Sequence, residues 1–144
     1  MSKAELAAGC FAGGFNCSQS VFSTYAPDLG LDRAAALKVA AAFGGGFVRT
    51  GETCGAVTGA LMVIGLKYGC TRPDDNDAKT KTIETGRKFL EKFKQRNGSL
   101  ACRTLLGCDL STPEGMKKAT DEKLFSTVCP KFVRAAAEIL DEVL

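Results

Sequence analysis

The sequence predicts an all-α protein, a compact single-domain bundle of about six helices. Three observations lead to this prediction. Alternating runs of apolar and polar residues bounded by turns, which are typical of strands, are nearly absent. Start and stop signals of helices recur along the chain instead. The 144 residues match the size of one ordinary domain, and no linker or repeat divides them, so residues 1–144 are expected to fold as one unit.

The first half of the chain divides into four predicted helices. Each begins after a side chain that can cap a first turn, and each ends at glycine or before proline. The four are a helix opened by the capping box of Ser2 with Glu5 and reaching about Gly13, a helix from Cys17 to about Tyr25 between Asn16 and Pro27, an alanine-rich helix from Asp32 to the Gly44-Gly45-Gly46 break, and a helix from Cys54 to Tyr68 between Thr53 and Gly69.

The second half of the chain carries four more start signals. They predict a long amphipathic helix from Asp74–Asp77 to Asn97-Gly98, a short turn capped by Ser99 and ending at Leu106-Gly107, a helix starting at Thr112-Pro113-Glu114, and a last helix capped by Cys129 before Pro130. Apolar residues at helical spacing give two of these helices a buried face. These residues are Ile83, Leu90 and Phe93, bordered by Phe89, in the long helix, and Phe132, Val133, Ala136, Ile139, Leu140 and Val143 in the last.

The composition is that of a globular domain. Apolar residues make up 45% of the chain and charged residues 24%, which indicates neither disorder nor a membrane protein. The net charge is +3 and the basic residues are scattered, so no nucleic-acid partner is expected. The longest apolar run, residues 54–66, is shorter than the roughly 20 residues that span a bilayer. Lys3 and Glu5 interrupt the N-terminal stretch and argue against a secretory signal, so a cytoplasmic location is expected.

Histidine is absent from the chain. Its absence removes Ser–His and Cys–His nucleophile pairs, proton transfer by imidazole, mixed Cys/His zinc sites and covalent c-type haem. Residues 46–53 imitate a phosphate loop, but Glu52 stands where lysine is essential and no strand precedes it, so no nucleotide is expected. No acid or base positioned at a substrate pocket is evident, and whether the protein is an enzyme stays open.

Seven cysteines are the residues left to carry chemistry, and the odd number leaves at least one unpaired within the chain. In a reducing compartment such thiols indicate metal binding or redox work more than structural bridges. Four of them lie in the first turn of a predicted helix. They are Cys17, Cys54, Cys102 and Cys129. The other three lie inside a helix or after a helix end: Cys10, Cys70 and Cys108.

The position at a helix start favours the thiolate. Free backbone N–H groups and the positive end of the helix dipole stabilise negative charge there, so the pKa of the four thiols is expected to be lowered. The alternative is that these cysteines pack as small, inert apolar side chains, as free cysteine often does.

One local motif stands out, residues 54–59, which read Cys-Gly-Ala-Val-Thr-Gly after a glycine-rich stretch. Gly55 and Gly59 lie four apart on one helix face, where small residues let another backbone approach closely. Together with Gly51 they are also expected to supply space and backbone around the Cys54 sulfur for a cofactor.

The motifs in order resemble a bacterial and archaeal family of redox-active proteins defined by four cysteines and a CGAxxG motif. The residues that carry the resemblance are Asn16-Cys17, the glycine run, Gly51-Glu52-x-Cys54-Gly55-Ala56-x-x-Gly59-Ala60-Leu61, Cys102-Arg103-x-Leu105-Leu106-Gly107-x-Asp109 and Cys129-Pro130. The resemblance spans nearly the whole chain. It implies that the family cysteines are Cys17, Cys54, Cys102 and Cys129. A similar domain accompanies haem segments in some cytochromes that also carry an iron–sulfur centre, and this chain has no haem-binding segment.

Four hypotheses for the function follow. Cys17, Cys54, Cys102 and Cys129 supply the ligand set of a [2Fe–2S] or [4Fe–4S] cluster, which would exchange electrons with a redox protein partner. Without metal, the same thiols could act in thiol–disulfide exchange, which needs only two sulfurs within bridging distance. A structural zinc site with four cysteine ligands is a third hypothesis, although such sites usually have short paired spacings. A helical interaction module with inert cysteines is the fourth.

Overall fold

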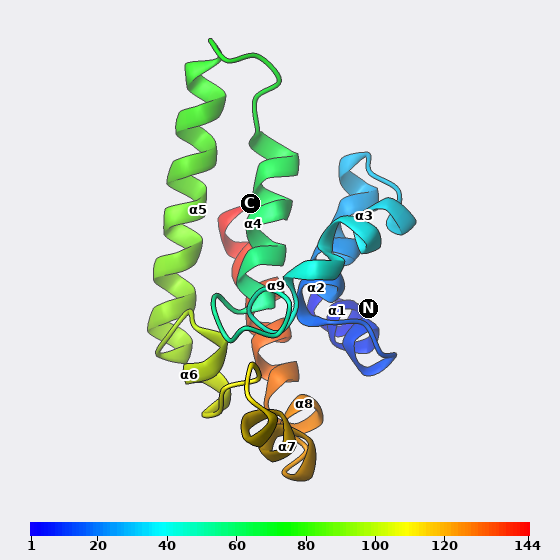
Figure 1. The fold of residues 1–144 in the computed structure, drawn as a ribbon. Coiled ribbons are helices and arrows are strands. Elements are labelled where there is room, and N and C mark those ends of the chain that lie inside the picture. The colour runs from blue at the N-terminus through cyan, green and yellow to red at the C-terminus, as the bar shows by residue number, and fades with distance from the viewer.

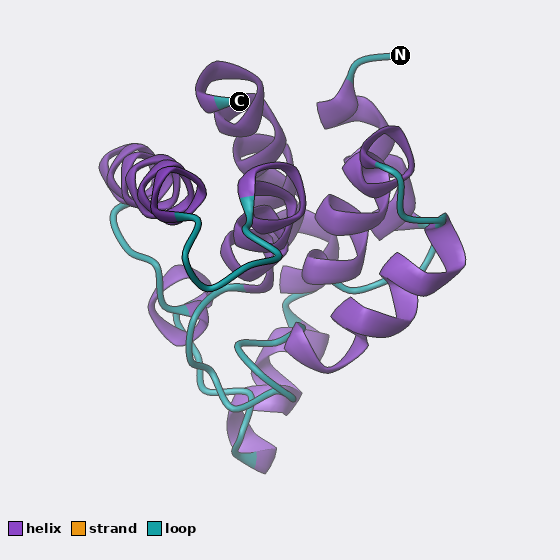
Figure 2. Cartoon of the chain, turned by 90° about the horizontal axis from the view of Figure 1, so that it is seen from above, coloured by secondary structure: helices purple, strands orange, loops and turns teal.

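The computed structural model describes residues 1–144, and helices joined by turns and loops make up the chain (Figure 1, Figure 2). The helices are α1 (Lys3–Ala12), α2 (Cys17–Tyr25), α3 (Arg33–Ala40), α4 (Gly55–Tyr68), α5 (Asn76–Asn97), α6 (Cys102–Leu106), α7 (Pro113–Asp121), α8 (Leu124–Thr127) and α9 (Cys129–Val143), with 3-10 turns at Ala26–Leu29 and Ala41–Phe43. The predicted all-α class is confirmed. The predicted number of about six helices is too low: nine are present, among them the short α6 and α8, and α8 has no side-chain cap that could have marked its start.

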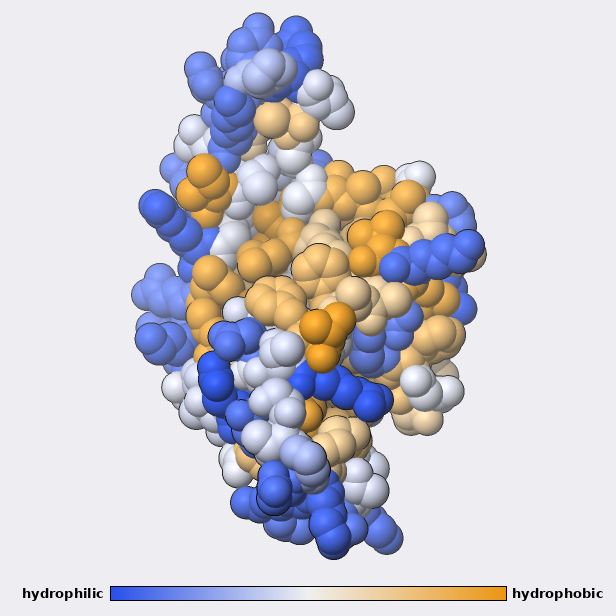
Figure 3. Space-filling view, viewed as in Figure 1, coloured by the Kyte–Doolittle hydropathy of each residue, from blue (hydrophilic) through white to orange (hydrophobic).

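Helices α4 and α9 lie at the centre of the molecule (Figure 1). The long α5 packs against both of them on one side, and α1 and α2 pack against them on the other, with α3 outside α2. Helices α6, α7 and α8 gather at one end, next to the start of α9 (Figure 1). Apolar residues gather in the middle of the face seen in Figure 3, and charged residues cover its two ends. No helix is both long and apolar enough to cross a membrane.

Capping chemistry explains most of the helix starts. Ser2 and Asn16 each form a complete capping box, with Glu5 and Gln19 as the reciprocal partners. The side chain of Thr112 accepts a hydrogen bond from the N–H of Gly115 before α7. These helices begin where the sequence predicted, because the capping interactions are local.

Two helix starts differ from the prediction. Cys54, not Thr53, precedes α4, and Ala101, not Ser99, precedes α6. The reason is an isolated antiparallel bridge between Thr53 and Ala101, the single β-type contact of the chain, which keeps both segments extended. Ser99 instead accepts a hydrogen bond from the N–H of Ala101 in a local turn.

The core lies between α4, α5 and α9. The rings of Phe89 and Phe93 stack with centroids 5.9 Å apart, and both are fully buried. Four residues of the predicted α9 face are buried as expected: Val133, Ala136, Ile139 and Leu140. Four predicted core residues are not fully buried. Phe132 and Val143 in α9 and Leu90 in α5 are half-buried, and Ile83 in α5 is 54% exposed.

Helices α2 and α4 approach each other closely because glycines line the contact. A Cβ atom built on Gly59 would lie 2.7 Å from the carbonyl oxygen of Ser18, and one on Gly55 would lie 3.0 Å from the Ser18 nitrogen. Such distances exclude a side chain unless the helices move apart. The expected close backbone approach is therefore confirmed, and the space beside Gly59 is filled by α2.

We expect Gly59→Ala to destabilise the protein by about 1–3 kcal/mol, because the added methyl group overpacks the contact with α2. Gly65→Ala is the matched control in the same helix, since a Cβ atom there would meet nothing within 4 Å. Alanine favours the helix at Gly65, so this change is expected to stabilise by about 0.5–1 kcal/mol. Chemical unfolding followed by circular dichroism measures both, and equal effects of the two substitutions would refute the packing role of Gly59.

Candidate functional site

Four cysteines lie at helix starts. Cys17, Cys102 and Cys129 are the first residues of α2, α6 and α9, and Cys54 directly precedes α4. The start of α9 is one residue earlier than predicted, because Val128 and not Cys129 precedes it. The predicted position in the first turn of a helix is confirmed for Cys17, Cys102 and Cys129, and Cys54 lies one residue before the first turn of α4.

Backbone hydrogen bonds hold Cys54 and Cys102 side by side. The Cys54 N–H donates to the carbonyl of Leu100 at 2.8 Å, and the Cys102 N–H donates to the carbonyl of Glu52 at 2.6 Å. The bridge between Thr53 and Ala101 lies between these two bonds. Cys54 and Cys102 are 48 positions apart in the sequence (102 − 54), and these backbone hydrogen bonds form a short ladder that holds their segments together.

The motif residues around this ladder have structural roles. Arg103 Nη2 contacts Glu52 Oε1 at 3.0 Å and so links the two segments a second time. Gly51 has φ +78°, a left-handed conformation that favours glycine, and its N–H donates to the carbonyl of Gly45. A Cβ atom at Gly51 would lie 3.2 Å from Cβ of Arg103. Gly51 therefore shapes the loop that carries Cys54.

Cys17 is positioned by the residue before it. The Asn16 side chain caps α2 and donates from Nδ2 to the carbonyl of Ala41 at 3.0 Å. A Cβ atom at Gly44 would lie 2.5 Å from the Asn16 side chain, so glycine is needed for the loop to pass. The start of α2 is thereby fixed against the loop that follows α3.

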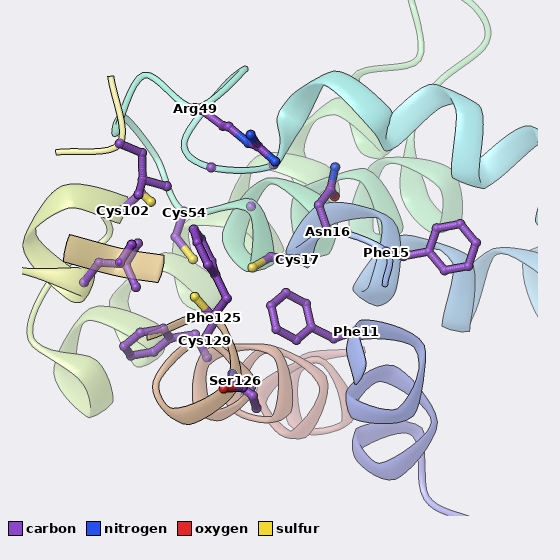
Figure 4. Close-up of a pocket in the computed structure, with 18 of the residues that line it drawn as sticks. Phe11, Phe15, Asn16, Cys17, Arg49, Cys54, Cys102, Phe125, Ser126 and Cys129 are labelled. Atoms are coloured by element: carbon purple, nitrogen blue, oxygen red, sulfur yellow. The ribbon is translucent and has the colours of Figure 1, made fainter. Parts of the chain in front are cut away.

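The four cysteines line one pocket with a volume of about 860 Å³. Figure 4 shows the sulfur atoms of Cys17, Cys54 and Cys129 turned toward one another, and Cys102 lies beside Cys54 in the wall of the same pocket. Of the three glycines expected near a cofactor, Gly55 lines the pocket, whereas Gly51 and Gly59 lie outside its wall.

The other three cysteines do not line the pocket. Cys10 lies in α1, where its sulfur is 3.7 Å from the Ser23 hydroxyl. Cys70 is exposed after the end of α4. Cys108 is half-buried after α6 and packs against the small apolar cluster that contains Cys102 and Cys129. The structure thus brings together the four cysteines of the predicted set in one pocket. Cys108 packs nearby but does not line this pocket.

The prediction of lowered thiol pKa values is wrong for three of the four cysteines. Burial raises the pKa of Cys54 to about 11, although the backbone N–H groups of Ala56 and Val57 act in the opposite direction. Burial, with the nearby Cys54 and Cys129, raises the pKa of Cys102 to about 12. The N–H groups of a helix start do stabilise a thiolate, but the loss of solvation outweighs them here.

Cys17 and Cys129 form a coupled pair of thiols. A hydrogen bond between their side chains lowers the pKa of Cys129 and raises that of Cys17, which burial raises further. Cys129 is therefore the thiol of this site whose pKa is lowered, so its thiolate form is the most favoured of the four.

In protein freed of metal and fully reduced, we expect iodoacetamide to modify Cys129 before Cys54 and Cys102. At pH 8 a thiol of pKa about 11 is about 0.1% thiolate and one of about 12 is about 0.01%. Peptide mapping by mass spectrometry over time gives the three rates. Cys17→Ala is expected to slow the reaction of Cys129, because the hydrogen bond that lowers its pKa is lost, whereas Cys10→Ala leaves the rate unchanged. Equal rates at the three cysteines would contradict the assignment.

The spacing of possible donors limits which metal the site could hold. All seven thiols are free, and no three side chains of histidine, cysteine, aspartate or glutamate are close enough to hold one metal ion. The four thiols therefore line a shared cavity but do not converge closely enough to bind one metal ion.

Most residues of the pocket wall were not predicted from the sequence. The rings of Phe11 and Phe125 face the sulfurs, and Arg49 extends toward Asn16 at the edge of the pocket (Figure 4). Phe11 and Phe125 come from α1 and α8, far apart in the sequence, and no local pattern distinguishes them from core residues. Arg49 follows the Gly44-Gly45-Gly46 run, and this position in the sequence was the one feature that could have marked it as a residue of the site.

Comparison with known proteins adds a family. The family model described as "Putative redox-active protein (C_GCAxxG_C_C)" matches residues 15–143. This range contains the four cysteines of the pocket and leaves out Cys10. No curated protein and no solved structure matches the chain. Because the match covers nearly the whole sequence, the chain belongs to the C_GCAxxG_C_C family of redox-active proteins.

Proposed function

We propose that Cys17, Cys54, Cys102 and Cys129 are the ligands of an iron–sulfur cluster and that the protein transfers electrons to a redox protein partner. The observation that carries the proposal is the convergence of four thiols, from four separate helix starts, on one pocket. Four cysteines are the full ligand set of a [2Fe–2S] or a [4Fe–4S] cluster, and the chain offers no histidine as an alternative ligand.

The spacing of the donors disfavours a single zinc ion. Four sulfurs at about 2.3 Å from one zinc ion would lie about 3.8 Å from one another. No three donors of the chain are close enough to hold one ion. In a [4Fe–4S] cluster the four thiolates bind four different iron atoms and are separated by the cluster itself, so a wider ring of sulfurs suits it, whereas in a [2Fe–2S] cluster two thiolates share each iron. A volume of about 860 Å³ leaves room for such a group.

The surroundings of the thiols suit an anionic centre. The N–H groups of Ala56 and Val57 act on the Cys54 sulfur and favour its thiolate form. The rings of Phe11 and Phe125 line the pocket beside the sulfurs. When bound, the cluster would accept and release one electron at a time. The raised pKa values of Cys54 and Cys102 describe the metal-free thiols, and binding of iron would displace their protons.

Metal analysis of protein purified without oxygen tests the proposal. We expect iron and acid-labile sulfide in similar amounts, with zinc well below either. Protein with zinc and no iron, or with no metal at all, would contradict cluster binding.

A second candidate function rests on the Cys17–Cys129 pair. The lowered pKa of Cys129 suits attack on a disulfide of a substrate protein, which would form a mixed disulfide and release one substrate thiolate. Cys17 would then attack the Cys129 sulfur and release the second thiol. The substrate disulfide gains two electrons, and Cys17 and Cys129 lose two. This candidate expects metal-free protein whose free thiols fall from seven to five on mild oxidation and return with reductant.

A further inference from the structure

The pocket extends well beyond the four thiols. Its volume of about 860 Å³ lies in the range of sites that enclose small organic molecules, about 300–1,000 Å³. Fifteen of its 25 lining residues are hydrophobic, and four phenylalanines from three parts of the chain belong to them. These are Phe11, Phe15, Phe125 and Phe132. The wall therefore offers apolar and aromatic surface on several sides of the space.

Apart from the thiols, the ionisable side chains of the wall are cations. Arg49 and Lys123 line the pocket, and no aspartate or glutamate does. The six ion pairs of the protein involve other cations, and neither side chain donates a hydrogen bond within the chain. Both side chains are exposed at the pocket edge. Two cations without partners next to an apolar space favour a ligand that carries negative charge.

The backbone at both cations is strained. Arg49 has φ +61° and Lys123 has φ +55°, and only two other non-glycine residues have a positive φ, Phe47 and Val48 of the same loop as Arg49. A left-handed conformation is unfavourable for a residue that has a side chain. Strain of this kind is concentrated at binding and catalytic sites. Here it occurs at the two positions that bring positive charge to the pocket.

Hydrogen bonds of the surrounding backbone hold these conformations. The N–H groups of Gly51 and Glu52 donate to the carbonyls of Gly45 and Gly46, both at 3.0 Å, and close the loop around Arg49. The carbonyl of Lys123 accepts from the N–H of Thr127 at 3.0 Å and from its hydroxyl at 2.8 Å. The two cations are thus carried by closed turns and not by free loops.

We infer that this pocket binds a small organic anion with an aromatic or apolar body, next to the cysteines. Arg49 and Lys123 would meet the anionic group, and the phenylalanine rings would contact the body. The inference goes beyond electron transfer, because it gives the site a small-molecule ligand. Arg49 and Lys123 are not among the proposed cluster ligands, and the organic anion would occupy the part of the pocket that the cysteines leave free.

Two fluorescent probes with similar bodies test the inference. 8-Anilino-1-naphthalenesulfonate carries a negative charge, and N-phenyl-1-naphthylamine lacks the sulfonate. The measured quantity is the ratio of their dissociation constants in the full-length protein. We expect the anionic probe to bind more tightly than the neutral one, and the double variant Arg49→Gln/Lys123→Gln to lower this preference by about tenfold. The ratio remains informative even if the substitutions alter the pocket, because both probes share the apolar contacts.

The matched control is Arg87→Gln/Lys88→Gln, which removes two exposed cations of α5 that do not line the pocket. This variant is expected to keep the preference of the unchanged protein. The inference is overturned if the anionic probe does not bind, if both probes bind equally, or if the two double variants change the ratio alike. The iron content of each sample is measured alongside the probe affinities, so failure here can be told apart from failure of the cluster proposal.

Discussion

Replacing Cys54 by serine is expected to remove most of the iron from the protein. Cys54 lies at the centre of the site, since it is joined to Cys102 by the backbone ladder and shares the pocket with Cys17 and Cys129. Loss of one ligand opens an iron atom to solvent, and serine binds iron less well than a thiolate does. Iron content per chain after anaerobic purification, together with the visible absorption spectrum, measures the effect.

Cys70→Ser is the matched control, because Cys70 is exposed and lies outside the pocket. It is expected to retain the iron content and spectrum of the unchanged protein. Equal iron in the Cys54→Ser and Cys70→Ser variants would mean that Cys54 is not a ligand. The dithiol candidate makes a different prediction. Under it, Cys54→Ser still forms the reversible disulfide, and Cys129→Ser does not.

Leu140→Ala is expected to lower the free energy of unfolding by about 2–5 kcal/mol. The Leu140 side chain is fully buried in α9, within the core that α4 and α5 share. Truncation to alanine removes its apolar contacts and leaves a cavity that a helical core fills only in part. Urea unfolding at equilibrium, with the slope compared between variants, gives the difference.

Leu6→Ala applies the same chemical change to an exposed position of α1, where the leucine is 44% exposed. It is expected to change the free energy of unfolding by no more than about 0.5–1 kcal/mol. A cost below about 1 kcal/mol for Leu140→Ala would show that α9 is not part of the core.

The sequence allowed the fold class and most helices to be predicted because their determinants are local. Ser2 and Asn16 cap helices through residues three positions later, and Pro113 marks the first residue of α7. The start of α4 was missed by one residue because Thr53 pairs with Ala101, and no local pattern reports a contact between such distant segments.

The candidate site shows the same division. The four helix-start cysteines could be selected from the sequence, since both the capping signals and the family resemblance point to them. The protonation of these cysteines could not be predicted, because the pKa of Cys54 depends on burial by helices that are distant in sequence. The left-handed backbone conformations of Arg49 and Lys123 could not be predicted either, since no pattern in the sequence marks an arginine or lysine that adopts a positive φ.

The central claim is that the cysteine pocket is a redox centre, and a reductive titration of protein isolated without oxygen tests it most directly. The visible absorption is recorded while reductant and then oxidant are added, and free thiols are counted in each state. We expect an absorption band that bleaches on reduction and returns on oxidation with the same amplitude over repeated cycles. A spectrum that does not change, with seven free thiols in every state, would show instead that the cysteines are inert packing residues.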